Sequence, residues 1–217
     1  MTRTRFTKKL VEIRMAVVTM HELVEQALKS LIPVLQNGLL DEAERIKAGD
    51  VEINKLEGKI FDLCASAIVT EQPVAQDLRR VISSLKIVAD LERIGDYAAN
   101  IAKQLLSYPH SVRVIKEVDF LPMIEQGVAQ LSSAISSYVN DDTGEARLVA
   151  AEDRKMDKLF DEVMERVANE LAGQSEPARE SWLQIAIIGR YLERLGDHVT
   201  NICEWTVYSV EGELVEL

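Results

Sequence analysis

Most of the chain consists of two copies of one helical pattern, and this repeat is the strongest constraint on its fold. The stretch LERIGDYAANI, Leu91 to Ile101, returns as LERLGDHVTNI, Leu192 to Ile202, at an offset of 101 residues. Upstream positions repeat at an offset of 103: Met20, Glu22, Leu28, Ser30, Ile32, Asn37, Ala48, Asp50 and Leu56 recur as Met123, Glu125, Leu131, Ser133, Ile135, Asn140, Ala151, Asp153 and Leu159. Self-similarity over this length predicts two homologous structural units.

Each unit is predicted to be a three-helix bundle. Apolar residues recur at helical spacing, as at Leu159, Val163, Val167 and Leu171, and strand-like alternation is missing. Turn signals in QNGLLD, EQP, SYPHS, NDDTG and GQSEP divide the chain into six long helices. We therefore expect an all-α protein of two homologous bundles related by pseudo-symmetry, over residues 1–108 and 123–217, joined by a segment over 109–122. Pro73 and Pro177 are expected at the start of each unit's third helix, where the missing N–H has no intrahelical partner.

Composition narrows the class of protein. A chain of 217 residues with 47% hydrophobic residues can bury a sizeable core, and 36 acidic against 25 basic residues oppose binding to nucleic acid or to an anionic lipid surface. No signal peptide and no run of about eighteen apolar residues is present, so a soluble, cytoplasmic protein is expected. Cys64 and Cys203 lie within apolar helical patterns and are expected to be buried as small hydrophobic residues.

The third helix of each unit carries an acidic face. A glutamate, an aspartate and an asparagine are spaced four apart in both copies: Glu92, Asp96 and Asn100, then Glu193, Asp197 and Asn201. Carboxylates at i and i+4 repel one another by about 0.2–0.5 kcal/mol, so these pairs require a cation or basic side chains nearby. Gly95 and Gly196 each cost about 1 kcal/mol in a helix interior, which is consistent with close approach of a helix or ligand.

The second helices supply further oxygen donors at the same spacing: Asp50 and Asn54 in the first unit, and Asp153, Asp157 and Asp161 in the second. Oxygen-only donor sets suit Mg, Ca, Mn or iron. The alternative interpretation is a solvated acidic face with salt bridges to Arg79, Arg80, Arg93 or Arg194. The repetition of charge, glycine and amide in one order favours metal. Because Asn54 stands where the second unit has Asp157, equal binding by the two units is not expected.

Catalytic constellations are missing from the sequence. None of the three histidines follows a glutamate at the spacing of a di-iron carboxylate site, and no glycine-rich phosphate loop or Cys–His pair is present. His198 directly follows Asp197, so on a helix it points about 100° away from the acidic face. We therefore expect a protein that is not an enzyme.

With these motifs the chain resembles the PhoU family of phosphate-transport regulatory proteins. The segments EQPVAQDLRRVISSLKIVADLERIGDYAANIAK, YLERLGDHVTNICEWTVY, RFTKKL and AGDVEINKLE carry the resemblance, which covers nearly the whole chain. It implies iron or zinc clusters at the motifs formed here by Glu92 with Asp96 and Glu193 with Asp197. Asp153 and Asp157 are plausible further ligands by position, and Asp77-Leu78-Arg79 has no counterpart in the second unit.

The resemblance also implies a function. Members of the family act as negative regulators of phosphate uptake and of the phosphate-starvation response, through contact with the ATPase subunit of the phosphate ABC transporter and with a sensor histidine kinase. We expect a homodimer that reaches the membrane only through these partners and binds no nucleic acid. Two alternatives stay open, which are a metal-storage or metal-buffering bundle and an accessory protein of another phosphate carrier.

Overall fold

The protein is a bundle of long helices in a computed structural model that describes residues 2–171 and 175–217. No strand occurs among these residues. The helices follow the chain in this order: α1 (Thr2–Asn37), α2 (Leu40–Glu71), α3 (Gln76–Ser107), the 3-10 helix η1 (Pro109–Ser111), α4 (Val112–Ile115), α5 (Leu121–Asn140), α6 (Thr143–Ala151), α7 (Asp153–Leu171) and α8 (Glu176–Glu211). The all-α prediction is confirmed.

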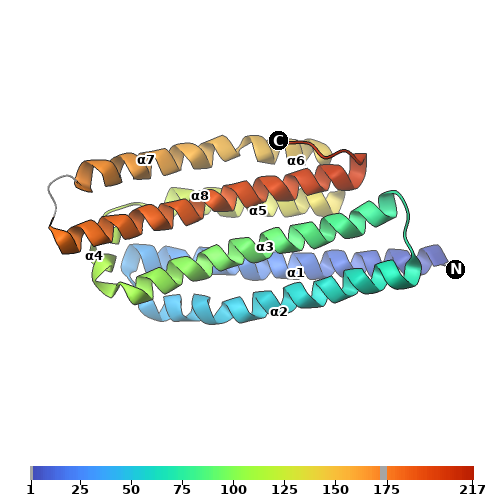
Figure 1. The fold of residues 1–217 in the computed structure, drawn as a ribbon, viewed down its shortest axis with the longest axis horizontal. Coiled ribbons are helices and arrows are strands. Elements are labelled where there is room, and N and C mark those ends of the chain that lie inside the picture. The colour runs from blue at the N-terminus through green and yellow to red at the C-terminus, as the bar shows by residue number, and fades with distance from the viewer. Residues whose placement is uncertain (1, 172–174) are drawn as a thin grey trace.

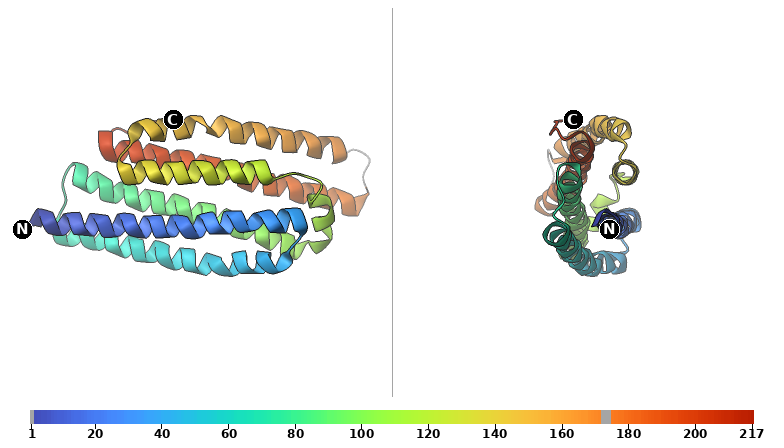
Figure 2. Two further views of the ribbon diagram at one scale, coloured as in Figure 1. Left: turned by 180° about the vertical axis from the view of Figure 1, so that it is seen from behind. Right: turned by 90° about the vertical axis from the view of Figure 1, so that its right-hand side faces the viewer.

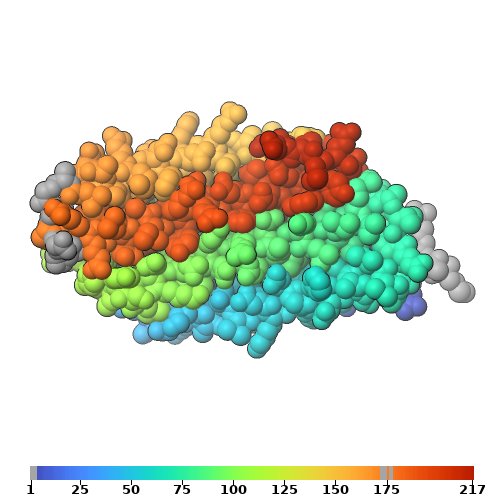
Figure 3. All heavy atoms as spheres, viewed as in Figure 1, coloured from blue at the N-terminus to red at the C-terminus, as the bar shows by residue number. Residues whose placement is uncertain are grey.

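Two three-helix bundles lie side by side with their long axes roughly aligned (Figures 1 and 2). The first consists of α1, α2 and α3, and the second of α5, the α6–α7 pair and α8. The bundles meet where α3 packs along α8 and α1 packs along α5. Side chains of α3 and α8 form a continuous seam on the face shown in Figure 3. The predicted pair of homologous bundles is therefore confirmed.

The second helix of the second bundle is interrupted once. It is divided into α6 and α7 at Glu152. The backbone N–H of Glu152 donates at 3.0 Å to the carbonyl of Val149, which lies three residues earlier rather than the four of an α-helix. The segment between the bundles contains η1 and α4, and α5 begins at Leu121. None of the helices in the described parts of the chain combines the length and apolar character needed to cross a membrane.

Three of the predicted turns end helices through left-handed residues, whereas α3 ends at Tyr108 with a φ of −125°. Gly38 follows α1 with a φ of 71°, and Asp141 ends α5 with a φ of 54°. The expectation for Pro73 is wrong, because Gln72 ends α2 in the left-handed region and α3 begins only at Gln76, after a turn. Pro177 does lie in the first turn of α8. Gly173 and Gln174 of the predicted GQSEP turn fall outside the described residues.

The core runs through both bundles. Cys64 and Cys203 are fully buried free thiols, as predicted, and Tyr138 is buried with its hydroxyl hydrogen-bonded to Ser84 of the other bundle at 2.7 Å. Val17 and Leu91 are fully buried within the same apolar cluster. A single core therefore spans the contact between the bundles, which makes the two units one structural body.

Two arginines of the first bundle clamp the end of α5. Arg80 donates to Asp141 Oδ2 at 2.9 Å, and Arg14 donates both to the carbonyl of Val139 at 3.1 Å and to Asp141 Oδ1. The side chains of Arg14, Arg80 and Asp141 are each about a quarter exposed. Cations at a helix C-terminus also interact favourably with its exposed carbonyls. We call Arg14, Arg80 and Asp141 the arginine clamp.

Candidate metal-binding faces

The first acidic face lies between α2 and α3. Glu92 and Asp96 of α3 face Asp50 and Glu57 of α2. Burial raises the pKa of Glu92, and the charges of Asp96, Glu57 and Asp50 raise it further. The pKa of Asp50 is also raised, first by burial and then by Asp96. Like charges close enough to affect one another in this way favour binding of a cation or a proton.

The second acidic face is its counterpart between α7 and α8. Burial, together with Asp157 and Asp197, raises the pKa of Asp153 to about 6. The pKa of Glu193 is raised by burial and by Asp197, Asp157 and Asp153. Asp153 and Asp157 also line a cavity of about 220 Å³ together with Arg147, Arg154, Thr200 and Leu217. The four acidic residues predicted for this unit therefore share one face.

Both faces leave a buried carboxylate oxygen at the same repeat position without a hydrogen-bond partner in the described part of the chain. These atoms are Asp50 Oδ1 and Asp153 Oδ1, and Glu193 Oε2 is a third. A buried polar atom without a partner costs about 1–3 kcal/mol, and a hard cation would satisfy it. Within residues 2–171 and 175–217, no three histidine, cysteine or acidic side chains converge as a group that could hold one metal ion. These carboxylates suit a hard cation because they are oxygen donors and because three of their buried oxygen atoms have no hydrogen-bond partner among the described residues. They do not form a closed coordination group in the described residues.

Basic side chains balance part of this charge, as the alternative interpretation requires. Arg190 binds Glu193 Oε1 at 2.6 Å in the second unit. In the first unit, Arg93 lies 3.7 Å from Glu92 and 3.9 Å from Asp96, and its side chain is 62% exposed. Exposed ion pairs of this length contribute little. Two other arginines predicted as possible partners act elsewhere, since Arg80 belongs to the clamp and Arg194 lies over the ring of Tyr97.

The two asparagines of the motif lie in different surroundings. Asn100 accepts a hydrogen bond from Lys103 at 3.4 Å, and Lys103 lies 4.0 Å from Asp50, so Asn100 borders the first face. Asn201 donates its amide to Asp90 of α3 at 3.2 Å, across the contact between the bundles. Its nitrogen is thereby directed away from the second acidic face. Both residues stay predictions as metal ligands.

The sequence interpretation missed Glu57. It lies seven residues after Asp50, which is two turns along the same side of α2, and the 103-residue offset places Phe160 at its position in the second unit. Each face consequently carries four carboxylates, although Asn54 replaces Asp157. The i to i+7 spacing from Asp50 was the signal that could have identified it.

A polar junction between the bundles was also missed. His198 Nδ1 donates to Asp90 Oδ1 at 2.8 Å, and His198 Nε2 shares a hydrogen bond of 3.0 Å with the hydroxyl of Tyr97. The ring of Tyr97 lies 5.6 Å from that of Tyr191. By the 101-residue offset, Tyr97 corresponds to His198 and Asp90 to Tyr191, so equivalent positions meet reciprocally across the pseudo-symmetry. The prediction that His198 points away from the acidic face agrees with these contacts.

The two motif glycines allow the second helices to approach. A Cβ at Gly95 would lie 3.0 Å from Ile53 Cδ1 of α2, and a Cβ at Gly196 would collide with the carboxylate of Asp153. Ile53 and Asp153 belong to the equivalent second helices. Glycine is therefore needed for helix contact in the first unit and for the position of a candidate ligand in the second.

Comparisons with known proteins agree with this architecture. The family model described as "PhoU domain" matches residues 17–105 and 120–206, which is one match in each bundle. The chain is 31% identical over 212 residues to the "phosphate-specific transport system accessory protein PhoU" of Edwardsiella tarda, covering 98% of this chain and 87% of that protein. The protein of the same description from Escherichia coli strain K12 is 31% identical over 209 residues, covering 96% and 86%.

Solved structures show the same fold over the full length. The crystal structure of the "phosphate transport system regulatory protein PhoU" from Streptococcus pneumoniae superposes with a TM-score of 0.84 at 27% identity, covering 98% of this chain and 100% of the other. The crystal structure of PhoU from Pseudomonas aeruginosa gives a TM-score of 0.84 at 28% identity, covering 96% and 100%.

Proposed function

Since the chain belongs to the PhoU family, we propose that it is a negative regulator of phosphate uptake and of the phosphate-starvation response. In this role it is a non-catalytic cytoplasmic adaptor between the ATPase subunit of a phosphate ABC transporter and a sensor histidine kinase. The observation that carries the proposal is the similarity over nearly the full length, through both bundles, to accessory proteins of phosphate-specific transport. These relatives support the more general statement that the chain is an accessory protein of a phosphate transport system.

The acidic faces supply the second part of the proposal. We propose that each binds hard cations through subsets of its four carboxylates, which are Asp50, Glu57, Glu92 and Asp96 in the first unit, and Asp153, Asp157, Glu193 and Asp197 in the second. The asparagines Asn100 and Asn201 are candidate neutral ligands at the ends of these faces. Iron, zinc, magnesium and manganese are the candidate ions. A bound cation would neutralise the mutual repulsion of the carboxylates and link the second helix of each bundle to the third.

The partner role is tested with the tagged full-length chain. Recovery from membranes and cytosol of phosphate-replete cells, followed by mass spectrometry, is expected to yield the transporter ATPase or the sensor kinase. Recovery of neither, with the bait shown to be folded by circular dichroism, would contradict the adaptor role and favour metal storage.

The metal role is tested separately by the double variant Asp96→Ala and Asp197→Ala. We expect it to bind fewer ions per chain in elemental analysis of protein purified without chelator, and to lose partner affinity. Wild-type protein that contains no metal under these conditions would contradict the cation proposal. Unchanged affinity in a variant that has lost its ions would separate metal binding from the adaptor role.

A further inference from the structure

We propose that the outer groove between α1 and α2 is the docking site for one amphipathic helix of a partner protein. This inference rests on the proposed adaptor role and assigns the surface through which it acts. The groove has two hollows along its length. Its occupant is a helix, because the walls are two antiparallel helices with a line of apolar side chains between them.

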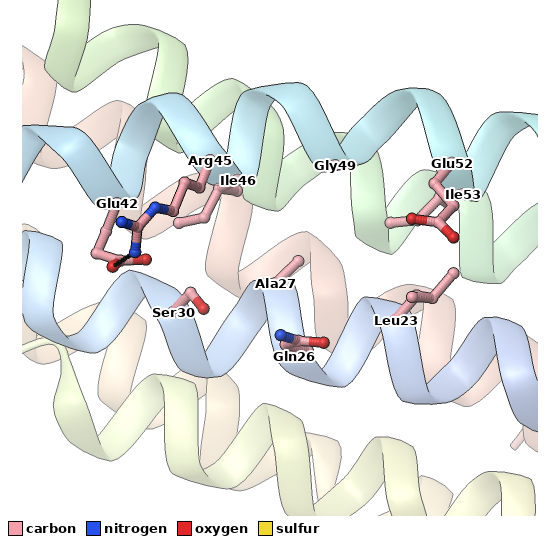
Figure 4. A pocket seen from close by; sticks show the side chains of 10 residues that line it. All are labelled: Leu23, Gln26, Ala27, Ser30, Glu42, Arg45, Ile46, Gly49, Glu52 and Ile53. Carbon is pink, nitrogen blue, oxygen red and sulfur yellow. Dashed lines mark hydrogen bonds and ion pairs between the residues drawn. The ribbon is translucent and has the colours of Figure 1, made fainter.

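The first hollow has a volume of about 300 Å³ and lies between the C-terminal half of α1 and the start of α2 (Figure 4). Leu23, Ala27, Ile46 and Ile53 give it an apolar floor. Its rim is polar and consists of Gln26, Ser30, Glu42, Arg45 and Glu52. An apolar floor with a polar rim is the usual composition of a helix-binding groove.

The second hollow lies further along the same pair of helices and has a volume of about 430 Å³. Val11 and Met15 line it, and they are 51% and 67% exposed although both are large apolar residues. Lys8 and Lys59 stand on opposite walls. Residues 8 to 30 of α1, which line the two hollows, span about 33 Å at 1.5 Å per residue, so a helix of roughly twenty-two residues would cover both.

Gly49 keeps the first hollow open. A Cβ at this position would meet nothing within 4 Å among the described residues, so no contact with them requires glycine there. Glycine nevertheless costs about 1 kcal/mol relative to alanine in an exposed helix interior. A glycine at this position would allow the backbone of a bound helix to approach α2 closely.

The second bundle provides an internal comparison, because its equivalent groove is closed at this point. Glu152 stands where the first bundle has Gly49, and it accepts a hydrogen bond of 3.3 Å from Gln126, the counterpart of Leu23. A hollow further along that groove is lined mainly by charged side chains: Glu125, Lys155, Lys158 and Glu162. That hollow has a volume of about 550 Å³, so the second bundle differs from the first in the bridge between Gln126 and Glu152, which crosses its groove where the first bundle has Gly49.

The charges along the groove define the partner's chemistry. Lys8, Lys59 and Glu12 line the second hollow, so that end of the groove carries two positive charges and one negative charge, although the chain has a net charge of −11. At the other end, Arg45 is held by Glu42, while Glu52 has no ion-pair partner among the described side chains. The complementary helix carries acidic residues over the two lysines, apolar residues over Met15, and basic residues over Glu52. This polarity also fixes its direction along the groove.

The test uses Gly49→Leu with Gly58→Leu as a matched control. Both glycines lie in α2, and a Cβ at either position meets nothing within 4 Å, so both variants are expected to fold. They are nine residues apart, which places them on opposite sides of the helix, and Gly58 lines neither hollow. The probes are the purified transporter ATPase subunit and the cytoplasmic part of the sensor kinase, titrated by calorimetry.

We expect Gly49→Leu to weaken binding to one of these probes by about tenfold or more, and Gly58→Leu to change it by less than about twofold. Charge reversal at Lys59 is expected to weaken the same complex, whereas Lys158→Glu in the second bundle is not. Wild-type affinity in Gly49→Leu would overturn the groove proposal and leave the adaptor role standing. A wild-type chain that binds neither probe would overturn both. A change in self-association alone, measured by sedimentation, would assign the groove to a second copy of the chain and also overturn the proposal.

Discussion

Replacing Asp141 with alanine is expected to be among the most destabilising single changes at the contact between the bundles. The substitution removes the carboxylate to which Arg14 and Arg80 of the first bundle donate. It also places an alanine at a φ of 54°. This left-handed conformation is unfavourable for residues with a β-carbon, although asparagine and aspartate tolerate it better than alanine. The two effects have separate magnitudes.

The loss of the arginine clamp is the larger of the two effects. A hydrogen bond to a charged group contributes about 1.5–3 kcal/mol when buried, and these side chains are about a quarter exposed, so we take about 1–1.5 kcal/mol for each arginine. The left-handed conformation adds about 1 kcal/mol for alanine. Together these give a loss of about 3–4 kcal/mol in the free energy of unfolding, or roughly 6–16 °C in Tm for a chain of this size.

Three variants separate the two effects by urea denaturation followed by circular dichroism. Asp141→Gly removes only the clamp and is expected to cost about 2–3 kcal/mol, because glycine accepts the left-handed conformation. Asp141→Asn keeps an acceptor and tolerates the backbone, so about 1–2 kcal/mol is expected. Losses below about 0.5 kcal/mol in these two variants and in Asp141→Ala would refute the reasoning, since neither arginine would then depend on Asp141.

The remaining predictions concern the acidic faces and the open glycines. In buffer with chelator, stability is expected to rise as the pH falls from about 6 toward about 4, because the raised pKa of Asp153 makes the folded protein bind a proton that the unfolded chain releases. Asp153→Asn should reduce that rise in pH-dependent denaturation, and an unchanged profile would argue against a strained carboxylate. Added Mn²⁺ or Fe²⁺ should raise the Tm of the wild type and of the exposed control Asp62→Asn, but less so that of Asp197→Asn; equal shifts in all three would contradict the assigned ligands. Gly49→Ala and Gly58→Ala should each stabilise the chain by about 0.8–1 kcal/mol in urea, and a loss of stability in either would show that the glycine is needed for folding.

Local pattern was sufficient to predict much of this protein. The helical class, the two bundles and the acidic faces follow from apolar spacing, the repeat offset and i to i+4 placement. Apolar spacing and i to i+4 placement depend on residues that are close together in the chain, where the geometry of a helix fixes which side chains share a face. The repeat offset compares two such local patterns. Buried Cys64 and Cys203 were predicted for the same reason.

Tertiary structure decided which faces meet. Glu57 joins Glu92 only because α2 packs against α3 at a particular register, and the break at Glu152 was not visible in the periodic pattern of α6 and α7. Asn201, which shares its spacing with Asn100, instead donates to Asp90 across the contact between the bundles.

Contacts between residues about one hundred or more positions apart set that arrangement. The junction of Asp90, His198 and Tyr97 and the bond between Arg14 and Asp141 belong to this group. Helix registers and crossing angles depend on the packing of many side chains at once, and no short-range spacing encodes them. The sequence therefore determined the helices and their polar and apolar faces, whereas the relative placement of the bundles emerged only from three-dimensional packing.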